Sequence, residues 1–267
     1  MNFIVALQAE AMPLIDRFNL VKRSDTRVFP IFENKDHRII ISGIGRINAA
    51  AATGYLYRFE EYSQGILNIG IAGHGELSTG TSFLANRVLH SEEKTVYYPP
   101  PILEHPITTS ALQTCDTPEK LYPHPIGYDM EAHAICSIAY RSITRELVQI
   151  IKIVSDNPSN PLESFSKKTA TNLIASQLTL IEEIVEQMDD LSNRLSPDPV
   201  ILELIEQIRS KFHFSSTQTH QLEKLVKQAN ALGLGITKIS SIADCADNAK
   251  NCINSLRQNL EPIRRLS

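Results

Sequence analysis

The sequence predicts an α/β fold followed by a separate all-helical segment. Over about the first 195 residues, short apolar runs alternate with amphipathic helical patterns, which is typical of a layered α/β domain with a parallel or mixed sheet. Several runs end in glycine-rich turns, and ligands of such folds collect at these strand ends. After Ser196-Pro197-Asp198-Pro199 only helical periodicity remains. We therefore expect one domain at residues 1–195 and a second at residues 200–267.

The predicted strands are continuous apolar runs, which suit strands that are covered on both faces. They are residues 3–7, 38–42, 65–70, 82–89 and 146–154. Helical patterns follow the first strand from about residue 10 and the second strand over 47–57. Residues 91–126 contain seven prolines, which predicts a loop region without regular structure.

The remaining elements are predicted helices. A stripe of apolar positions with a period of 3.6 residues predicts one helix over 169–195. Three further patterns predict helices over 201–212, 222–232 and 242–263, the second of which ends at Gly233 and Gly235. Three- and four-residue spacing in the last pattern suits packing against another helix. The sequence therefore predicts a small all-α C-terminal appendage.

Composition and charge exclude several classes of protein. The chain of 267 residues is 42% hydrophobic and 21% charged with a net charge of −4, which is ordinary for a soluble globular protein and implies no general affinity for nucleic acid. Residues 200–267 carry nine Lys/Arg and six Asp/Glu, a net of +3, but a nucleic-acid surface needs denser clustering. No apolar run approaches the roughly 18 residues of a membrane span. The first apolar run lacks a preceding basic region and is interpreted as a strand, not a signal peptide.

Cysteine and histidine positions argue against a metal centre. The four cysteines form no CxxC pair, which indicates free thiols in a reducing cytoplasm. They are Cys115, Cys136, Cys245 and Cys252. Three histidines, His74, His124 and His133, lie near the motifs described next, without metal-ligand spacing. We expect no metal and no cofactor.

Five motifs follow one another in a fixed order. They are residues 6–10 (Ala-Leu-Gln-Ala-Glu), 42–50 (Ser-Gly-Ile-Gly-Arg-Ile-Asn-Ala-Ala), 68–73 (Asn-Ile-Gly-Ile-Ala-Gly), 127–134 (Gly-Tyr-Asp-Met-Glu-Ala-His-Ala) and 154–156 (Val-Ser-Asp). Over residues 1–190 the chain thereby resembles the nucleoside phosphorylase family, and within it the 5′-methylthioadenosine/S-adenosylhomocysteine nucleosidases. The resemblance implies a three-layer αβα sandwich with a central mixed sheet. It also implies a homo-oligomer that binds a small-molecule nucleoside. We expect a cytoplasmic protein, and the composition argues against membrane and nucleic-acid partners.

Cleavage of an N-glycosidic bond requires a grip on the ribose, help for the departing base and a nucleophile on the opposite face. Glu131 is the candidate ribose ligand, because a carboxylate can accept hydrogen bonds from the 2′- and 3′-hydroxyls together. The resemblance assigns it this role and places Met130 beneath the sugar. The alternative is that Glu131 stabilises the first turn of the following helix.

Two further carboxylates complete the candidate site. The resemblance places Asp156, after Ser155 at a strand end, opposite N7 of a purine, and it assigns Glu10 to activate the attacking water. The alternatives are a turn aspartate, which Asn157-Pro158 would suit, and an ordinary acidic first-turn residue. The family pattern Ser-Asp-x-Ala-Asp is incomplete, because Ser159 stands where the second aspartate is expected.

The nucleophile is predicted to be water. A phosphorylase needs hydroxyls and an arginine around a phosphate dianion, whereas Ile71 occupies a position that often carries Ser or Thr. Arg46 remains a candidate anion-binding residue, and Ala72, Gly73 and Ser155 are candidate substrate contacts. We predict a purine nucleosidase acting on a nucleoside or 5′-modified nucleoside. Two alternatives stay open, a phosphate-dependent phosphorylase and a degenerate nucleoside-binding sensor without catalysis.

Overall fold

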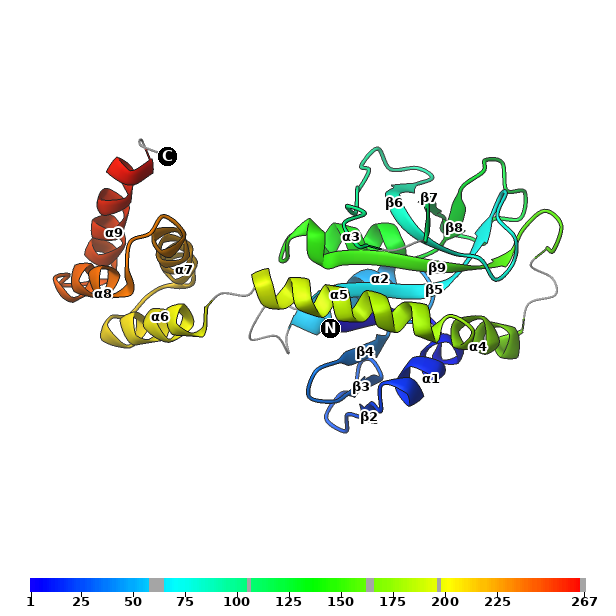
Figure 1. Ribbon diagram of the computed structural model, residues 1–267, viewed down its shortest axis with the longest axis horizontal. Coiled ribbons are helices and arrows are strands. Elements are labelled where there is room, and N and C mark those ends of the chain that lie inside the picture. The colour runs from blue at the N-terminus through cyan, green and yellow to red at the C-terminus, as the bar shows by residue number, and fades with distance from the viewer. Residues whose placement is uncertain (58–64, 105–106, 162–165, 196–197, 265–267) are drawn as a thin grey trace. The chain divides into compact units, whose positions relative to one another are not determined.

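The computed structural model describes residues 1–57, 65–104, 107–161, 166–195 and 198–264 (Figure 1). The chain divides into two compact units, Met1–Leu195 and Ser196–Ser267. Two of the four residues that were predicted to separate the domains, Ser196 and Pro197, lie outside the described ranges. In the described ranges, no helix has both the length and the apolar character that crossing a membrane demands.

The first unit is built on a mixed sheet, as the sequence predicts. Its described strands are β1 (Asn2–Val5), β2 (Val21–Lys22), β3 (Ile31–Glu33), β4 (Arg38–Ile41), β5 (Ile66–His74), β6 (Ser82–His90), β7 (Thr108–Thr114), β8 (Gly127–Asp129) and β9 (Val148–Asp156). Their order is β2-β3-β4-β1-β5-β8-β7-β6-β9, and β9 also pairs in parallel with β5. Strands β5, β8, β7, β6 and β9 therefore form a closed circuit of pairings, and β2 lies at the open end of the order.

Helices cover both faces of this sheet. They are α1 (Gln8–Arg17), α2 (Arg46–Leu56), α3 (Ala132–Ala139), α4 (Lys167–Ala175) and α5 (Leu178–Leu195), with a short 3-10 turn, η2 (Arg145–Leu147). Ile4 packs in a buried cluster with α2 and α3, whereas its neighbours Phe3 and Val5 pack in a second cluster with α1, α4 and α5. Because successive strand residues point to opposite faces, the continuous apolar run at β1 fills both clusters.

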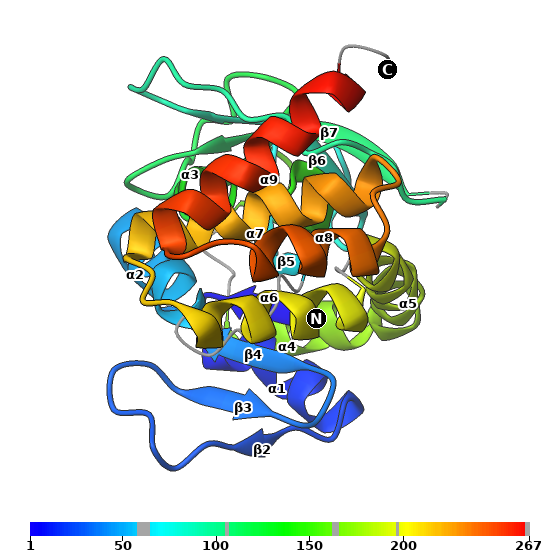
Figure 2. The same ribbon diagram turned by 90° about the vertical axis from the view of Figure 1, so that its left-hand side faces the viewer.

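The second unit contains four helices in its described part, α6 (Pro199–Lys211), α7 (Ser216–Ala231), α8 (Ile236–Asp244) and α9 (Ala249–Arg264) (Figure 2). Their buried apolar side chains form one core. The Asp198 side chain caps α6 by accepting from the Val200 N–H (2.9 Å). Ser215 and Gln218 form a capping box that begins α7. Gly233, at a φ of 80°, follows the end of α7 in the left-handed region that glycine tolerates.

Three expectations about single elements are wrong. Residues 108–114, predicted as part of a loop, form β7, because a run of threonines and alternating side chains between the prolines suits a strand. The helix predicted over 169–195 is interrupted between α4 and α5 at Ser176 and Gln177. The helix predicted over 242–263 is two helices, α8 and α9, separated after Asp244.

Candidate active site

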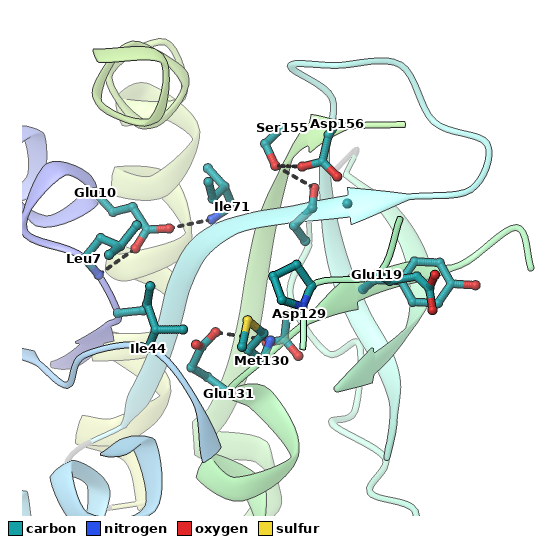
Figure 3. A pocket seen from close by; sticks show the side chains of 15 residues that line it. Leu7, Glu10, Ile44, Ile71, Glu119, Asp129, Met130, Glu131, Ser155 and Asp156 are labelled. Atoms are coloured by element: carbon teal, nitrogen blue, oxygen red, sulfur yellow. Dashed lines mark hydrogen bonds between the residues drawn. The ribbon is translucent and has the colours of Figure 1, made fainter. Parts of the chain in front are cut away.

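The carboxyl ends of β5 and β9, the start of α1 and the segment before α3 surround a cavity of about 330 Å³ (Figure 3). This volume is in the range of small-molecule sites. Seven of the eight residues predicted for the site line it, namely Glu10, Ala72, Gly73, Met130, Glu131, Ser155 and Asp156. Leu7, Ile44, Ile71, Pro118, Glu119, Tyr128, Asp129 and Ala6 complete the lining.

Glu10 lies in the first turn of α1 and is 2% exposed. Its carboxylate accepts hydrogen bonds from the N–H groups of Leu7 (2.8 Å) and Ile71 (2.9 Å), which satisfies one donor of the helix start and one of β5. Burial raises the pKa of Glu10, and these hydrogen bonds together with the positive charge of Lys152 offset only part of that increase. A buried carboxylate of raised pKa is a better proton acceptor than an exposed one.

Glu131 is the N-cap residue of α3, but its side chain makes no capping hydrogen bond. Its carboxylate accepts from the N–H groups of Gly45 (2.8 Å) and Met130 (3.3 Å), while Asp129 accepts from the Ala132 N–H (2.9 Å) at the start of the helix. Gly45 has a φ of 96°, a conformation that favours glycine. Burial, reinforced by repulsion from Asp129, raises the pKa of Glu131 to about 7.

A buried lysine that belongs to none of the five sequence motifs, Lys152, lies behind these carboxylates. The Lys152 ammonium is 3.0 Å from Asp129, whose other oxygen accepts from the Thr114 hydroxyl (2.6 Å). Burial lowers the pKa of Lys152, but attraction to Asp129, Glu131 and Glu10 outweighs it and the net pKa is raised. The available signal was a lysine inside the apolar run of β9, because an unpaired charge is not stable there.

Asp156 ends β9 and is 4% exposed. One carboxylate oxygen accepts from the Ser155 hydroxyl and the other accepts from the Tyr122 hydroxyl at 2.5 Å. The turn that follows is held by Asn157, whose side-chain oxygen accepts from the N–H groups of Ser159 and Asn160. The turn function that competed with a catalytic role for Asp156 therefore belongs to Asn157.

The cavity is strongly acidic. Five carboxylates line it, those of Glu10, Glu119, Asp129, Glu131 and Asp156, and its described lining contains no lysine, arginine or histidine. Such a lining favours a ligand that develops positive charge and repels an anion.

Arg46 is the predicted site residue that the structure does not bring to the cavity. Its guanidinium forms an ion pair with Glu93 and contacts His90 (2.7 Å) and Asp116 (3.4 Å). It is therefore already neutralised by nearby carboxylates. No group of three or more histidine, cysteine, aspartate or glutamate side chains within the described ranges is arranged to hold a metal ion.

Several solved structures share this fold at low sequence identity. The 5′-methylthioadenosine/S-adenosylhomocysteine nucleosidase of Neisseria meningitidis, in complex with methylthio-immucillin-A, has a TM-score of 0.58 at 21% identity, covering 70% of this chain and 98% of its own. The corresponding nucleosidase of Colwellia psychrerythraea 34H, in complex with adenine, has a TM-score of 0.56 at 20% identity, covering 70% and 94%. Futalosine hydrolase of Helicobacter pylori strain 26695 has a TM-score of 0.58 at 12% identity, covering 70% and 97%.

These neighbours confirm, at the level of fold, the resemblance found in the motifs. Comparisons with models of protein families and with curated proteins find no match for the chain. The chain therefore has the fold of these nucleosidases and hydrolases, and fold alone does not determine its activity.

Proposed function

We propose that the chain hydrolyses the N-glycosidic bond of a purine nucleoside or a 5′-modified purine nucleoside. The observation that carries this proposal is the convergence of Glu10, Glu131 and Asp156, distant in sequence, on one sugar-sized cavity. Neighbours of the same fold that are nucleosidases and hydrolases support it.

In the proposed mechanism, Glu131 accepts hydrogen bonds from the ribose hydroxyls with Met130 against the sugar. Asp156 hydrogen-bonds the purine, and Glu10 accepts a proton from the attacking water. The C1′–N9 bond breaks as a bond from C1′ to the water oxygen forms, and the net transfer is one proton from water to the departing base. The five carboxylates of the lining stabilise the positive charge that develops on the ribose.

The lining favours water over phosphate as the nucleophile. A phosphate dianion would have to bind beside five carboxylates, and the described lining offers it no cationic side chain. The Lys152 ammonium behind the cavity already forms an ion pair with Asp129. Hydrolysis is therefore the better-supported reaction, and phosphorolysis is the competing outcome.

The test is a nucleoside panel read by chromatography for free base. Purified chain is incubated with adenosine, inosine, 5′-methylthioadenosine and S-adenosylhomocysteine, each with and without phosphate. Hydrolysis predicts free base and free sugar at the same rate in both buffers. Formation of ribose 1-phosphate would replace the proposal by a phosphorylase, and absence of any base release would remove the enzymatic function.

We also propose that the first unit forms a homo-oligomer. Ile44, which lines the cavity, is 51% exposed, and Ile47 in the first turn of α2 is 87% exposed. Apolar side chains of this size at the edge of a site are typical of an association surface. Light scattering of the purified chain measures its mass in solution, and a monomer at micromolar concentration would contradict the proposal.

A further inference from the structure

The contact between Tyr122 and Asp156 joins the cavity to the loop of residues 115–126, which connects β7 to β8. Tyr122 is 7% exposed and Asp156 is 4% exposed, so the hydrogen bond between them is shielded from water. Tyr122 does not line the cavity, whereas Asp156 does. The tyrosine hydroxyl therefore reaches the carboxylate from behind the ligand space.

The backbone holds Tyr122 in an unfavourable conformation to make this contact. Its φ is 46°, in the left-handed region, which costs free energy for a residue with a side chain. The following Pro123 restricts the backbone of Tyr122 further. Such strain persists only where the surrounding structure over-determines it, and it gathers at functional sites.

Two glycines, Gly73 at the end of β5 and Gly75 just beyond it, make room for the loop. A Cβ atom on Gly73 would lie 2.7 Å from Asp156 Oδ2 and 2.8 Å from Tyr122 Cε1. A Cβ atom on Gly75 would lie 2.0 Å from the carbonyl oxygen of His124. The loop is therefore seated against the end of β5 and the residue just beyond it, with no space for a side chain between them.

Tyrosine packing and hydrogen bonds secure the same loop. The Tyr128 hydroxyl accepts from the His124 N–H (2.9 Å), and the rings of Tyr122 and Tyr128 meet edge to face at 6.1 Å. Because Tyr128 lines the cavity, the packing that fixes Tyr122 is continuous with the ligand space.

We propose that Tyr122 is a positioning residue for the proposed hydrolysis, which holds the Asp156 carboxylate in the orientation from which it hydrogen-bonds the departing base. This inference rests on the proposed function. With Ser155 on one oxygen and Tyr122 on the other, the carboxylate cannot rotate without losing a buried hydrogen bond. The carboxyl group then keeps a fixed orientation toward the base.

The test uses two substrates that differ in how much help the leaving group needs. A purine departs as a poor leaving group and depends on Asp156, whereas 4-nitrophenyl β-D-ribofuranoside releases a stable anion that needs no such help. Tyr122→Phe removes the hydroxyl and keeps the ring. Tyr140→Phe is the matched control, since it removes another largely buried tyrosine hydroxyl, one that has no hydrogen-bond partner among the residues that the structure describes.

Tyr122→Phe is expected to lower kcat for the best purine nucleoside of the panel about tenfold or more, because a hydrogen bond to a charged group is lost. KM should stay within about threefold, and hydrolysis of the nitrophenyl riboside should change less than about twofold. Asp156→Asn should also slow the purine nucleoside much more than the nitrophenyl riboside, and its kcat for the purine nucleoside should fall further than that of Tyr122→Phe. Tyr140→Phe should match the parent on both, and thermal melting should report a folded protein for each variant.

Equal slowing of both substrates by Tyr122→Phe would mean a general structural defect and would overturn the inference. An unchanged kcat for the purine nucleoside would overturn it as well, while leaving the proposed hydrolysis intact. If the nitrophenyl riboside is not cleaved by the parent, the purine nucleoside alone is compared. A fall in kcat with KM within about threefold then supports the inference, and a rise in KM with kcat unchanged overturns it. If the parent releases no base from any nucleoside, the proposed function fails first and the role of Tyr122 fails with it.

Discussion

Replacing Glu131 by glutamine should stabilise the folded chain at alkaline pH while it removes hydrolysis. The amide keeps an oxygen that can accept from the Gly45 N–H, but it cannot ionise. In the folded chain, burial and Asp129 raise the pKa of Glu131 from 4.5 to about 7. A raised carboxyl pKa means that ionisation costs folding free energy, so stability is intact below pH 4.5 and declines as the pH rises toward about 7.

The magnitude follows from the gap between the two pKa values. The gap between 4.5 and about 7 corresponds to about 3 kcal/mol at pH 8.5 and to less than about 1 kcal/mol at pH 5. Glu131→Gln should recover these amounts, because the glutamine carries no charge to desolvate. For a unit of this size, about 3 kcal/mol corresponds to a rise in melting temperature of roughly 6 to 12 °C.

Differential scanning calorimetry at the two pH values measures this effect on the full chain. Glu186→Gln is the control, because Glu186 is exposed on α5 and its replacement should leave both melting temperatures within about 1 °C. An increase of the same size at pH 5 and pH 8.5 would refute the electrostatic reasoning, and so would a loss of stability at pH 8.5. A variant that is more stable and inactive is the expected signature of a binding carboxylate.

Further predictions concern the same cavity. Asp156→Asn should abolish release of a purine while binding of a nucleoside analogue, measured by calorimetry, stays within about threefold; loss of both would indicate an unfolded site. Lys152→Met should lower the free energy of unfolding by about 3–5 kcal/mol in urea titrations monitored by circular dichroism, because Asp129 would be left buried without its cation; a change below about 1 kcal/mol would contradict the pairing. The kcat/KM for a nucleoside should rise with pH up to about 7 and then level off, since Glu131 grips ribose as a carboxylate; a flat profile between pH 5 and 8 would count against this. Residues 1–195 expressed alone should keep the hydrolytic rate, because the described cavity lies within that unit, and inactivity of a folded fragment would assign the helical unit a part in the site.

The mixed α/β architecture and the meeting of the acidic motifs could be predicted because both follow from local pattern. Continuous apolar runs indicate buried strands, and ligand sites of such folds collect at strand ends, where the motifs stand. The break between α4 and α5 could not be predicted in this way, because Ser176 and Gln177 are not strong helix breakers. There the side-chain amide of Gln177 donates to the Gly80 carbonyl (3.3 Å), a tertiary contact that no local pattern contains.

The residues that hold the acidic side chains in place are harder to predict from the sequence than the acidic side chains themselves. Tyr122 lies in a proline-rich stretch where sequence pattern predicts only turns, and its partner Asp156 is 34 residues away. Lys152 has a visible signal, a charge in an apolar strand, but its partners Asp129 and Glu131 come from other elements. Long-range pairing of this kind becomes evident only when the strands are placed side by side.

The closed circuit of strands β5, β8, β7, β6 and β9 also bears on how the protein behaves at high concentration. A strand with an unpaired side is a template for association with other chains, and closure removes such sides. In the described sheet, the order ends openly at β2, which has only two residues, Val21 and Lys22, both exposed. A short edge that carries a lysine is a poor template, so the first unit is protected against edge-to-edge aggregation.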